Sequence, residues 1–311
     1  MTLRKQRLKM IPKYEKFFDD EVKEFIRISE TFAQEYVGNS LEDIRQSYNE
    51  MVKHFRQARP SSVQVEDKKV AFKERSLIYR QYSKGTDSKS DLIYFHGGGF
   101  VVGGLESHDD ICAEICESTG CNVFSLDYSL APEVQYPEFF LDAIRFYYFI
   151  KNPERRLILV GDSAGGTLAG FVANKVRNVS IRPEAQVLIY PYLAGQISGP
   201  KKRKFSDAPL LTQDDIDFYH KYAGLPLKKG LHDLIKNFHH DNMPKTLVVS
   251  AQIDPLAEDC QAYVKSLKQC GCDITFLEGI GLPHGFLRAR HLSNKARLVF
   301  EEIIKFINKT K

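Results

Sequence analysis

The sequence predicts an α/β fold in which a mostly parallel sheet of eight strands is covered by helices on both faces. Short apolar segments alternate with longer segments of helical periodicity over most of the 311 residues, and this alternation is typical of parallel sheets. The segment Leu157–Val160 is apolar at each position, as expected of a strand that is buried on both faces. It runs into Gly161-Asp-Ser-Ala-Gly165 and then a small-residue helical pattern, which predicts Ser163 at the carboxyl edge of the sheet. A glycine-rich turn capped by a serine is the alternative, which the flanking strand and helix disfavour.

The first 60 residues differ from the rest because they have helical periodicity and no strand pattern. Apolar residues recur at helical spacing from Tyr14 to Tyr36, and Ser40 is typical of the capped start of a second helix that ends near Arg59. We expect residues 1–60 to form a helical cap on the remaining domain, residues 61–311. A simple N-terminal support is the alternative interpretation of the two helices.

The rest of the chain contains the predicted strands and helices in alternation, and the first two strands are expected to pair as a hairpin. The predicted strands are Lys69–Glu74, Ser76–Tyr82, Asp91–Phe95, Asn122–Asp127, Leu157–Val160, Val187–Tyr190, Thr246–Ser250 and Ile274–Glu278. The predicted helices are Glu138–Ile150, the segment from Ser163 to Arg177, Thr212–Tyr222, Ala257–Gln269 and Ser293–Ile307. Open parallel sheets bind ligands beyond the carboxyl ends of their strands, so we expect the functional site at that edge.

Composition and charge disfavour several classes of protein. The net charge of +4 is small and the positive residues are spread along the chain, which argues against nucleic-acid binding, and the basic run Lys201–Lys204 is interpreted as a solvated loop. No stretch approaches the roughly 20 apolar residues of a membrane helix, and no apolar signal segment follows the basic start Met1–Lys9. The six cysteines include no C-x-x-C pair, so we expect reduced thiols, no metal site of that kind and a cytoplasmic location.

A serine nucleophile needs a histidine base and usually a carboxylate that orients it. His284 follows the last predicted strand, within Gly279–Phe286, and Asp254 follows the strand Thr246–Ser250. Asp254 could instead be only the N-cap of the next helix. The order Ser163, Asp254, His284 is nucleophile, acid, base, an order that serine hydrolases use, and it favours the catalytic interpretation.

The glycine run Gly97-Gly98-Gly99 directly after a strand can present backbone N–H groups to a negatively charged oxygen. Phosphate binding is the alternative, but the chain has neither G-x-G-x-x-G nor G-K-[ST] at this point. His96 is interpreted as a structural histidine that fixes this loop. Of the remaining histidines we expect His108, His239, His240 and His291 at the surface and His54, His220 and His232 in helices or at their ends, away from the sheet.

Five motifs occur in order between residues 68 and 309. They are His96-Gly-Gly-Gly-Phe100, Asp127-Tyr-Ser-Leu-Ala-Pro-Glu133 with Tyr136-Pro137, Gly161-Asp-Ser-Ala-Gly-Gly166, Asp254-Pro-Leu256 and His284-Gly-Phe286. Together they resemble the hormone-sensitive-lipase-like branch of the α/β-hydrolases, a group of carboxylesterases that includes acetyl esterases and arylacetamide deacetylases. The resemblance implies the α/β-hydrolase fold.

The resemblance also implies roles for single residues. Ser163 would be the nucleophile, His284 the general base and then acid, and Asp254 the group that orients the imidazole. The backbone N–H groups that would form the oxyanion hole are those of Gly98, Gly99 and Ala164. The N-terminal helices, with a second cap segment around residues 193–225, are similar to the cap that covers the acyl pocket in this family, and no metal or organic cofactor is implied.

Two positions depart from the family pattern. Ser129 and Ala257 stand where the family commonly has arginine, and from Ser129 we expect an internal ion pair to be missing. These changes concern local stability rather than chemistry. Asp127 and Glu133 would be structural, and for Asp162 a loop-holding role is the default interpretation.

The sequence therefore predicts a serine carboxylesterase that hydrolyses short-chain acyl esters through an acyl-enzyme. An amidase or deacetylase acting on N-acyl substrates would use the same three residues and is the first alternative. A non-catalytic small-molecule receptor is a second, disfavoured because His284 is retained, and a scaffold protein is a third. An exposed edge near the last strand would permit a homodimer.

Overall fold

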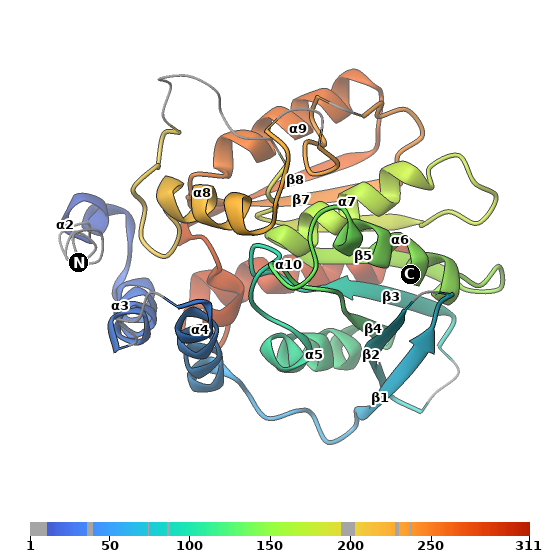
Figure 1. Ribbon diagram of the computed structural model, residues 1–311, viewed down its shortest axis with the longest axis horizontal. Helices are drawn as coiled ribbons and strands as arrows, with labels where there is room; N and C mark the ends of the chain where they lie inside the picture. Colours follow the sequence, from blue (N-terminus) through green and yellow to red (C-terminus); the bar gives the residue numbers. More distant parts are fainter. Residues whose placement is uncertain are drawn as a thin grey trace.

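The sheet at the centre of the molecule has the predicted architecture. The computed structural model describes residues 11–35, 40–73, 75–85, 88–193, 203–227, 230–236 and 238–311. Within them, eight strands lie in the order β1-β2-β4-β3-β5-β6-β7-β8, with helices on both faces (Figure 1). The strands are β1 (Gln64–Ala71), β2 (Ser76–Ser83), β3 (Ser90–Phe95), β4 (Asn122–Asp127), β5 (Arg156–Asp162), β6 (Ala185–Ile189), β7 (Lys245–Ile253) and β8 (Ile274–Pro283). The β1–β2 and β2–β4 pairs are antiparallel and all the others are parallel, which confirms the prediction.

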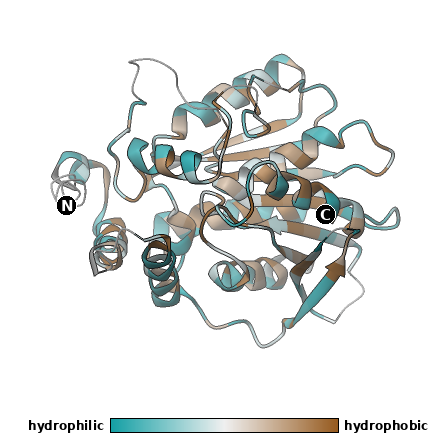
Figure 2. Ribbon diagram, viewed as in Figure 1, coloured by the Kyte–Doolittle hydropathy of each residue, from teal (hydrophilic) through white to brown (hydrophobic). Residues whose placement is uncertain are grey.

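The sheet separates two apolar cores, because its central strands bury side chains on both faces. One core lies under α6 (Glu138–Ile150), α7 (Ala164–Lys175) and α9 (Ala257–Gln269), and the other lies under α3 (Asp20–Glu35), α5 (Asp109–Thr119) and α10 (Asn294–Thr310). Figure 2 shows the central strands as largely hydrophobic, whereas much of the edge strand β1 is hydrophilic. The other described helices are α2 (Ile11–Tyr14), α4 (Leu41–Phe55) and α8 (Gln213–Tyr222), with 3₁₀ turns η1 (Glu15–Phe17), η2 (Leu105–Ser107) and η3 (Phe286–Ala289).

Most predicted elements have the expected bounds to within a few residues, and α6, α9 and β4 match at both ends. Helix α5 was not predicted. The first predicted helix is interrupted, because the carboxylate of Asp19 accepts a hydrogen bond from the N–H of Val22 at 3.0 Å and so caps a new helix at Asp20. Strand β8 is longer than expected and runs to Pro283, since β7 continues alongside it to Ile253 after a local irregularity in register.

The N-terminal helices pack into the molecule rather than standing apart from it. Helix α4 begins at the predicted cap, where Ser40 and Asp43 form a reciprocal capping box. Val22 and Phe25 of α3 and Phe55 of α4 are buried in the core under α5 and α10. In Figure 1 both helices lie to one side of the sheet. The assignment of residues 1–60 as a cap stays a prediction, and residues 1–10 and 36–39 lie outside the described residues.

The basic run is not simply a solvated loop. Arg203 is only 2% exposed, and its guanidinium pairs with Asp259, so the prediction is wrong for this residue. Lys201 and Lys202 lie outside the described residues, as do Met1–Lys9. All six cysteines are free thiols, and no described helix is long and apolar enough to cross a membrane. The cytoplasmic location stays a prediction.

Candidate active site

The turn between β5 and α7 holds Ser163 in a conformation that few residues adopt. Ser163 has φ 52° and ψ −120°, which projects its side chain away from the strand. The turn is tight, since a Cβ on Gly161 would lie 2.3 Å from the carbonyl oxygen of Gly165. A Cβ on Gly165 would lie 1.9 Å from the carbonyl oxygen of Phe95 in β3. Only glycine fits at both positions, as the spacing G-x-S-x-G predicts.

The structure brings Ser163, His284 and Asp254 together at the carboxyl ends of β5, β8 and β7. His284 Nε2 lies 3.0 Å from Ser163 Oγ, and His284 Nδ1 lies 2.6 Å from Asp254 Oδ2. Because a carboxylate only accepts, Nδ1 carries the proton and Nε2 is left to accept the serine hydroxyl. This is the arrangement that lets an imidazole act as a general base toward a serine.

The buried carboxylate of Asp254 is held in place by a backbone donor as well. Its Oδ1 accepts a hydrogen bond from the N–H of Leu256 at 2.8 Å, and the side chain is only 1% exposed. Helix α9 has Leu256 as its N-cap, without a side-chain cap. The alternative interpretation of Asp254 as only an N-cap therefore does not describe this residue.

The segment from Gly97 to Val102, which we call the glycine loop, turns back on itself beside Ser163. The N–H groups of Val101 and Val102 both donate to the carbonyl oxygen of Gly98 at 3.0 Å. Gly98 has φ 129°, and a Cβ there would lie 2.1 Å from the carbonyl oxygen of Val102. The N–H groups of Gly98, Gly99 and Ala164 have no hydrogen-bond acceptor among the described residues. Ala164 is also the first residue of α7, where backbone N–H groups favour negative charge.

Asp162 joins the serine turn to the glycine loop, which agrees with a loop-holding role. Its buried carboxylate accepts hydrogen bonds from the N–H of Gly97 at 3.0 Å and from the hydroxyl of Tyr94 at 2.9 Å. Both bonds are to Asp162 Oδ1, and His108 Nε2 lies 3.1 Å from this oxygen. Burial by itself would raise the pKa of Asp162, but His108, Arg288 and the tyrosine hydroxyl outweigh it and lower the pKa to about 2.

Sequence reasoning missed several residues around the site. His108 was expected at the surface but is only 1% exposed, because its imidazole fills the space between Asp162 and Ser107. Arg288, four residues after His284, donates to the carbonyl oxygen of Ser107 at 2.8 Å and to the hydroxyl of Tyr48 in α4. No spacing in the sequence connects these positions.

The other histidine predictions have mixed outcomes. His96 is buried, with Nδ1 2.9 Å from the carbonyl oxygen of Gly97, which agrees with a structural role in the loop. His240 was expected at the surface but is buried against the ring of Tyr263. His239 and His291 are exposed as predicted. His54 lies in α4 and His220 in α8.

Near both positions where the resemblance leads us to expect an arginine, an arginine from another segment forms an ion pair. Arg75 donates to the hydroxyl of Ser129 at 3.2 Å and to the carboxylate of Asp142 at 2.8 Å, so the prediction of a missing ion pair is wrong. Near Ala257, the buried Arg203 pairs with Asp259 and donates to the carbonyl oxygen of Pro255 at 3.2 Å. Sequence position alone could not indicate either compensation.

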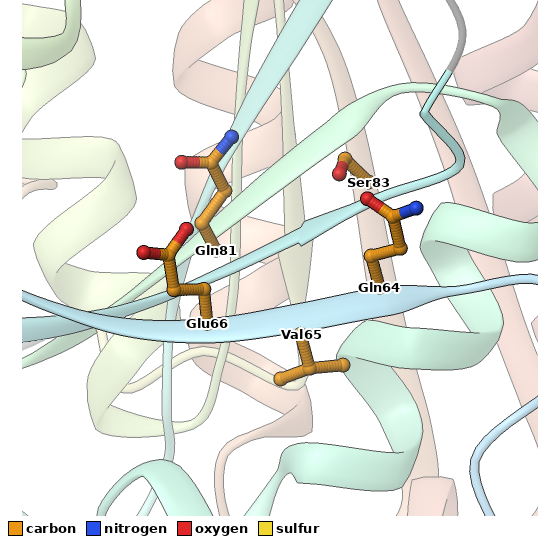
Figure 3. Close-up of a pocket in the computed structure, with 5 residues that line it drawn as sticks. All are labelled: Gln64, Val65, Glu66, Gln81 and Ser83. Atoms are coloured by element: carbon orange, nitrogen blue, oxygen red, sulfur yellow. The ribbon is translucent and has the colours of Figure 1, made fainter.

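Helix α8 belongs to the second predicted cap segment and lies against the glycine loop. A Cβ on Gly99 would lie 2.4 Å from the ring of Tyr219. Residues 194–202 of the same segment lie outside the described residues. A separate hollow on the hairpin of β1 and β2 contains none of the residues above and is shown in Figure 3; its lining is Gln64, Val65, Glu66, Gln81 and Ser83. Among the described residues no cluster of three histidine, cysteine or acidic side chains could hold a metal ion.

Comparisons with known proteins agree with the fold described above. A family profile described as alpha/beta hydrolase fold matches residues 92–288. An ethyl acetate hydrolase of Pseudomonas putida is 31% identical over 218 residues, which covers 66% of this chain and 68% of that protein. An acetyl esterase of Salmonella dublin is 32% identical over 224 residues, which covers 67% of this chain and 68% of that protein. The solved structure of a Pyrobaculum calidifontis esterase, 26% identical, superposes with a TM-score of 0.81 over 90% of this chain and 97% of that one.

Proposed function

We propose that this chain cleaves short-chain acyl esters with Ser163 as its nucleophile. The chain belongs to the hormone-sensitive-lipase-like branch of the α/β-hydrolase family and is a carboxylic ester hydrolase. The observation that carries the proposal is the continuous hydrogen-bonded series from Ser163 Oγ through His284 to Asp254, with distances of 3.0 and 2.6 Å. A serine hydroxyl is a weak nucleophile unless a base takes its proton, and this series supplies that base.

The first half of the reaction follows from these contacts. Ser163 Oγ attacks the ester carbonyl carbon while His284 Nε2 takes the hydroxyl proton, and the buried carboxylate of Asp254 stabilises the imidazolium that forms. The carbonyl oxygen becomes negatively charged. The N–H groups of Gly98, Gly99 and Ala164 would donate to it, since they have no other acceptor among the described residues. The bond to the alcohol oxygen then breaks, and His284 returns the proton to the leaving alcohol.

The second half repeats the sequence with water. A water molecule gives a proton to His284 Nε2 as its oxygen attacks the acyl-enzyme carbonyl, and the same backbone donors hold the new negative oxygen. The bond to Ser163 Oγ breaks, the serine recovers its proton from His284, and the carboxylic acid leaves. Atoms and protons balance over the two halves without a metal or organic cofactor.

A small acyl group is favoured by two observations. The ring of Tyr219 lies against the glycine loop at Gly99, next to a proposed oxyanion-hole residue, where it would limit the room for an acyl chain. The relatives include proteins named ethyl acetate hydrolase and acetyl esterase, and both names refer to esters of acetic acid. We further infer that the N-terminal helices and the segment around residues 193–225 cover the acyl pocket.

We also infer a homodimer that pairs through β8. This strand is the edge of the sheet at the end opposite β1, and its Ile280 is 55% exposed. An unpaired edge strand can pair with another copy. Sedimentation velocity at micromolar concentration tests this inference, and a monomer at all concentrations would contradict it.

The test of the proposed function is hydrolysis of p-nitrophenyl esters with acyl chains from two to twelve carbons. We expect kcat/KM to be highest for the shortest chains and to fall as the acyl chain lengthens past the wall that Tyr219 would form. p-Nitroacetanilide, which has the same acyl group on an amine, is the matched substrate for the amidase alternative. Faster cleavage of the anilide than of the acetate ester would favour that alternative, and tight binding of esters without turnover would favour a receptor.

A further inference from the structure

The backbone of the glycine loop is unfavourable on its own. Gly98, Gly99 and Phe100 have successive φ values of 129°, 62° and 64°. A positive φ is ordinary for glycine but disfavoured for phenylalanine, and it persists only where surrounding contacts hold it. Phe100 is buried, with its ring stacked on that of Phe139 at a centroid distance of 4.7 Å. The ring contact holds the side chain, but the peptide groups of the loop need hydrogen-bond partners of their own.

Helix α4 supplies such a partner through Arg45. The Nε of Arg45 donates to the carbonyl oxygen of Val101 at 2.9 Å, and its Nη2 donates to the carbonyl oxygen of Ala131 at 2.9 Å. The N–H of Ala131 in turn donates to the carbonyl oxygen of Phe100 at 2.8 Å. One guanidinium therefore joins the glycine loop, at the residue that follows Phe100, to the loop after β4.

Glu133 fixes the orientation of this guanidinium. Its two carboxylate oxygens accept from Arg45 Nη1 and Nη2 at 2.6 and 2.7 Å, in the two-point geometry that arginine forms with carboxylates. The side chain of Arg45 is 22% exposed, so it is largely shielded from water. A lysine at this position would have its three donors on one nitrogen and could not reproduce the planar fork that contacts two carbonyl groups and both oxygens of a carboxylate.

We propose that Arg45 is a positioning residue for the oxyanion hole, acting from the N-terminal helix α4 on the N–H groups of Gly98 and Gly99 through the carbonyl groups of Val101 and Ala131. The proposal rests on the proposed function. It gives α4 a role in the chemical step as well as in covering the pocket, because displacement of Val101 would move the turn that presents both N–H groups.

The first test is R45M, which keeps the aliphatic stem and removes the donors. Loss of an oxyanion-hole donor lowers kcat by about 10²- to 10³-fold in other serine hydrolases, and a displaced donor should cost less, so we expect kcat for p-nitrophenyl acetate to fall about 10- to 100-fold. KM should change less than about threefold, since the ground-state ester gains little from the oxyanion hole. Inhibition by a methyl trifluoromethyl ketone, whose adduct carries the oxyanion, should weaken in parallel with kcat/KM. If Arg45 only stabilised the fold, R45M would lower the melting temperature, but inhibition by the ketone would not weaken in parallel with kcat/KM.

Two further substitutions should lower kcat by less than R45M does. E133Q removes the charge that orients Arg45 but leaves both carbonyl contacts, so we expect a loss of kcat smaller than that of R45M. R45K should recover only part of the lost activity. The matched control is K53M on the same helix, which removes an exposed pair with Glu50 and should leave kcat unchanged. An E133Q loss equal to that of R45M, or full activity in R45K, would contradict the proposal.

Hydrogen exchange gives a readout that does not depend on esterase activity. In R45M we expect faster amide exchange in the peptide that covers residues 96–103 and unchanged exchange in β5 and α7. Unchanged exchange in that peptide, or kcat within twofold of an active wild type, would overturn the role of Arg45. A wild type that is folded but inactive on all esters would instead overturn the proposed function, and the exchange result would then still decide whether Arg45 holds the loop.

Discussion

The two sides of Ser163 are held in place by different means. On one side, Asp254 directly follows β7 and His284 directly follows β8, so the pairing of two adjacent parallel strands determines where their side chains meet. On the other side, the glycine loop follows β3 and turns back on itself. It is held by Asp162 at the end of the neighbouring strand β5 and by Arg45 from the distant helix α4. The placement of Asp254 and His284 thus depends on the sheet, whereas the proposed oxyanion hole depends on side chains far away in the sequence.

The largest effect should come from removing Ser163, which lies between the two sides, or His284, its proposed base. S163A should lower turnover of p-nitrophenyl acetate by on the order of 10⁴- to 10⁶-fold, and H284A by a similar factor. The double substitution should be no worse than either single one, because the two residues act as a unit. Stopped-flow and long-time assays measure these rates, with circular dichroism as the control for folding. A loss below about tenfold would mean that Ser163 is not the nucleophile.

D254N tests the side that the sheet positions. The amide of asparagine could still accept from Leu256 but could not hold the proton on His284 Nδ1 in the same way, so we expect kcat to fall about 10³- to 10⁴-fold. D259N is the matched control, because Asp259 lies five residues further on and pairs with Arg203 instead. Equal losses in the two variants would show that general disruption of α9, and not orientation of the histidine, accounts for the effect.

R203M tests whether the loop that carries Asp254 also needs a distant side chain for stability. Removal of Arg203 leaves the buried carboxylate of Asp259 without its partner, and loss of one member of a buried pair costs about 3–5 kcal/mol of unfolding free energy. Burial already raises the pKa of Asp259 to about 6 although Arg203 lowers it. Without Arg203 the pKa of Asp259 rises further, so the carboxyl is protonated at pH 5 and the loss should be smaller there than at pH 7.5.

Urea unfolding of R203M at the two pH values measures this difference. R27M, which breaks an exposed pair on α3, is the control and should change the unfolding free energy by less than about 1 kcal/mol. A loss in R203M that does not depend on pH would show that packing, and not the unpaired charge, is responsible.

The smallest effect concerns a buried histidine away from both sides of the serine. Burial, with a contribution from His220, lowers the pKa of His232 to about 4, against 6.5 in an unfolded chain. As pH falls from 6.5 toward 4 the unfolded chain takes up a proton that the folded protein does not, so stability is lost on acidification. Between pH 7 and pH 5 this loss should approach about 2 kcal/mol. H232Q should lose less stability than wild type over the same interval; an identical pH dependence would contradict this.

The difference between the two sides also explains what could be predicted from the sequence. Strand ends, the G-x-S-x-G turn and the order of Ser163, Asp254 and His284 are local features, and the sheet brought these three residues together as expected. The contacts of Arg45, His108 and Arg288 depend on how separate segments pack, and no local pattern specifies them. His108 was misplaced for that reason, because polar neighbours in the sequence suggest a surface position when their partners are unknown.

The same limit applies to the arginines that pair near Ser129 and Ala257. A substitution within a motif predicts the loss of a contact, but whether another residue replaces it depends on the fold. Arg75 comes from the turn between β1 and β2, and Arg203 from the segment before α8. Their geometry could be found only once the strands and helices were assembled.

The central claim is that the series Asp254, His284, Ser163 activates a single serine. Its most direct test is mass spectrometry of the intact protein and its peptides after incubation with diethyl p-nitrophenyl phosphate, which transfers a diethylphosphoryl group to activated serines. We predict one adduct on the peptide that contains Ser163, formed much more slowly in H284A and absent in S163A. An adduct on another residue, or none on the folded wild type, would contradict the account.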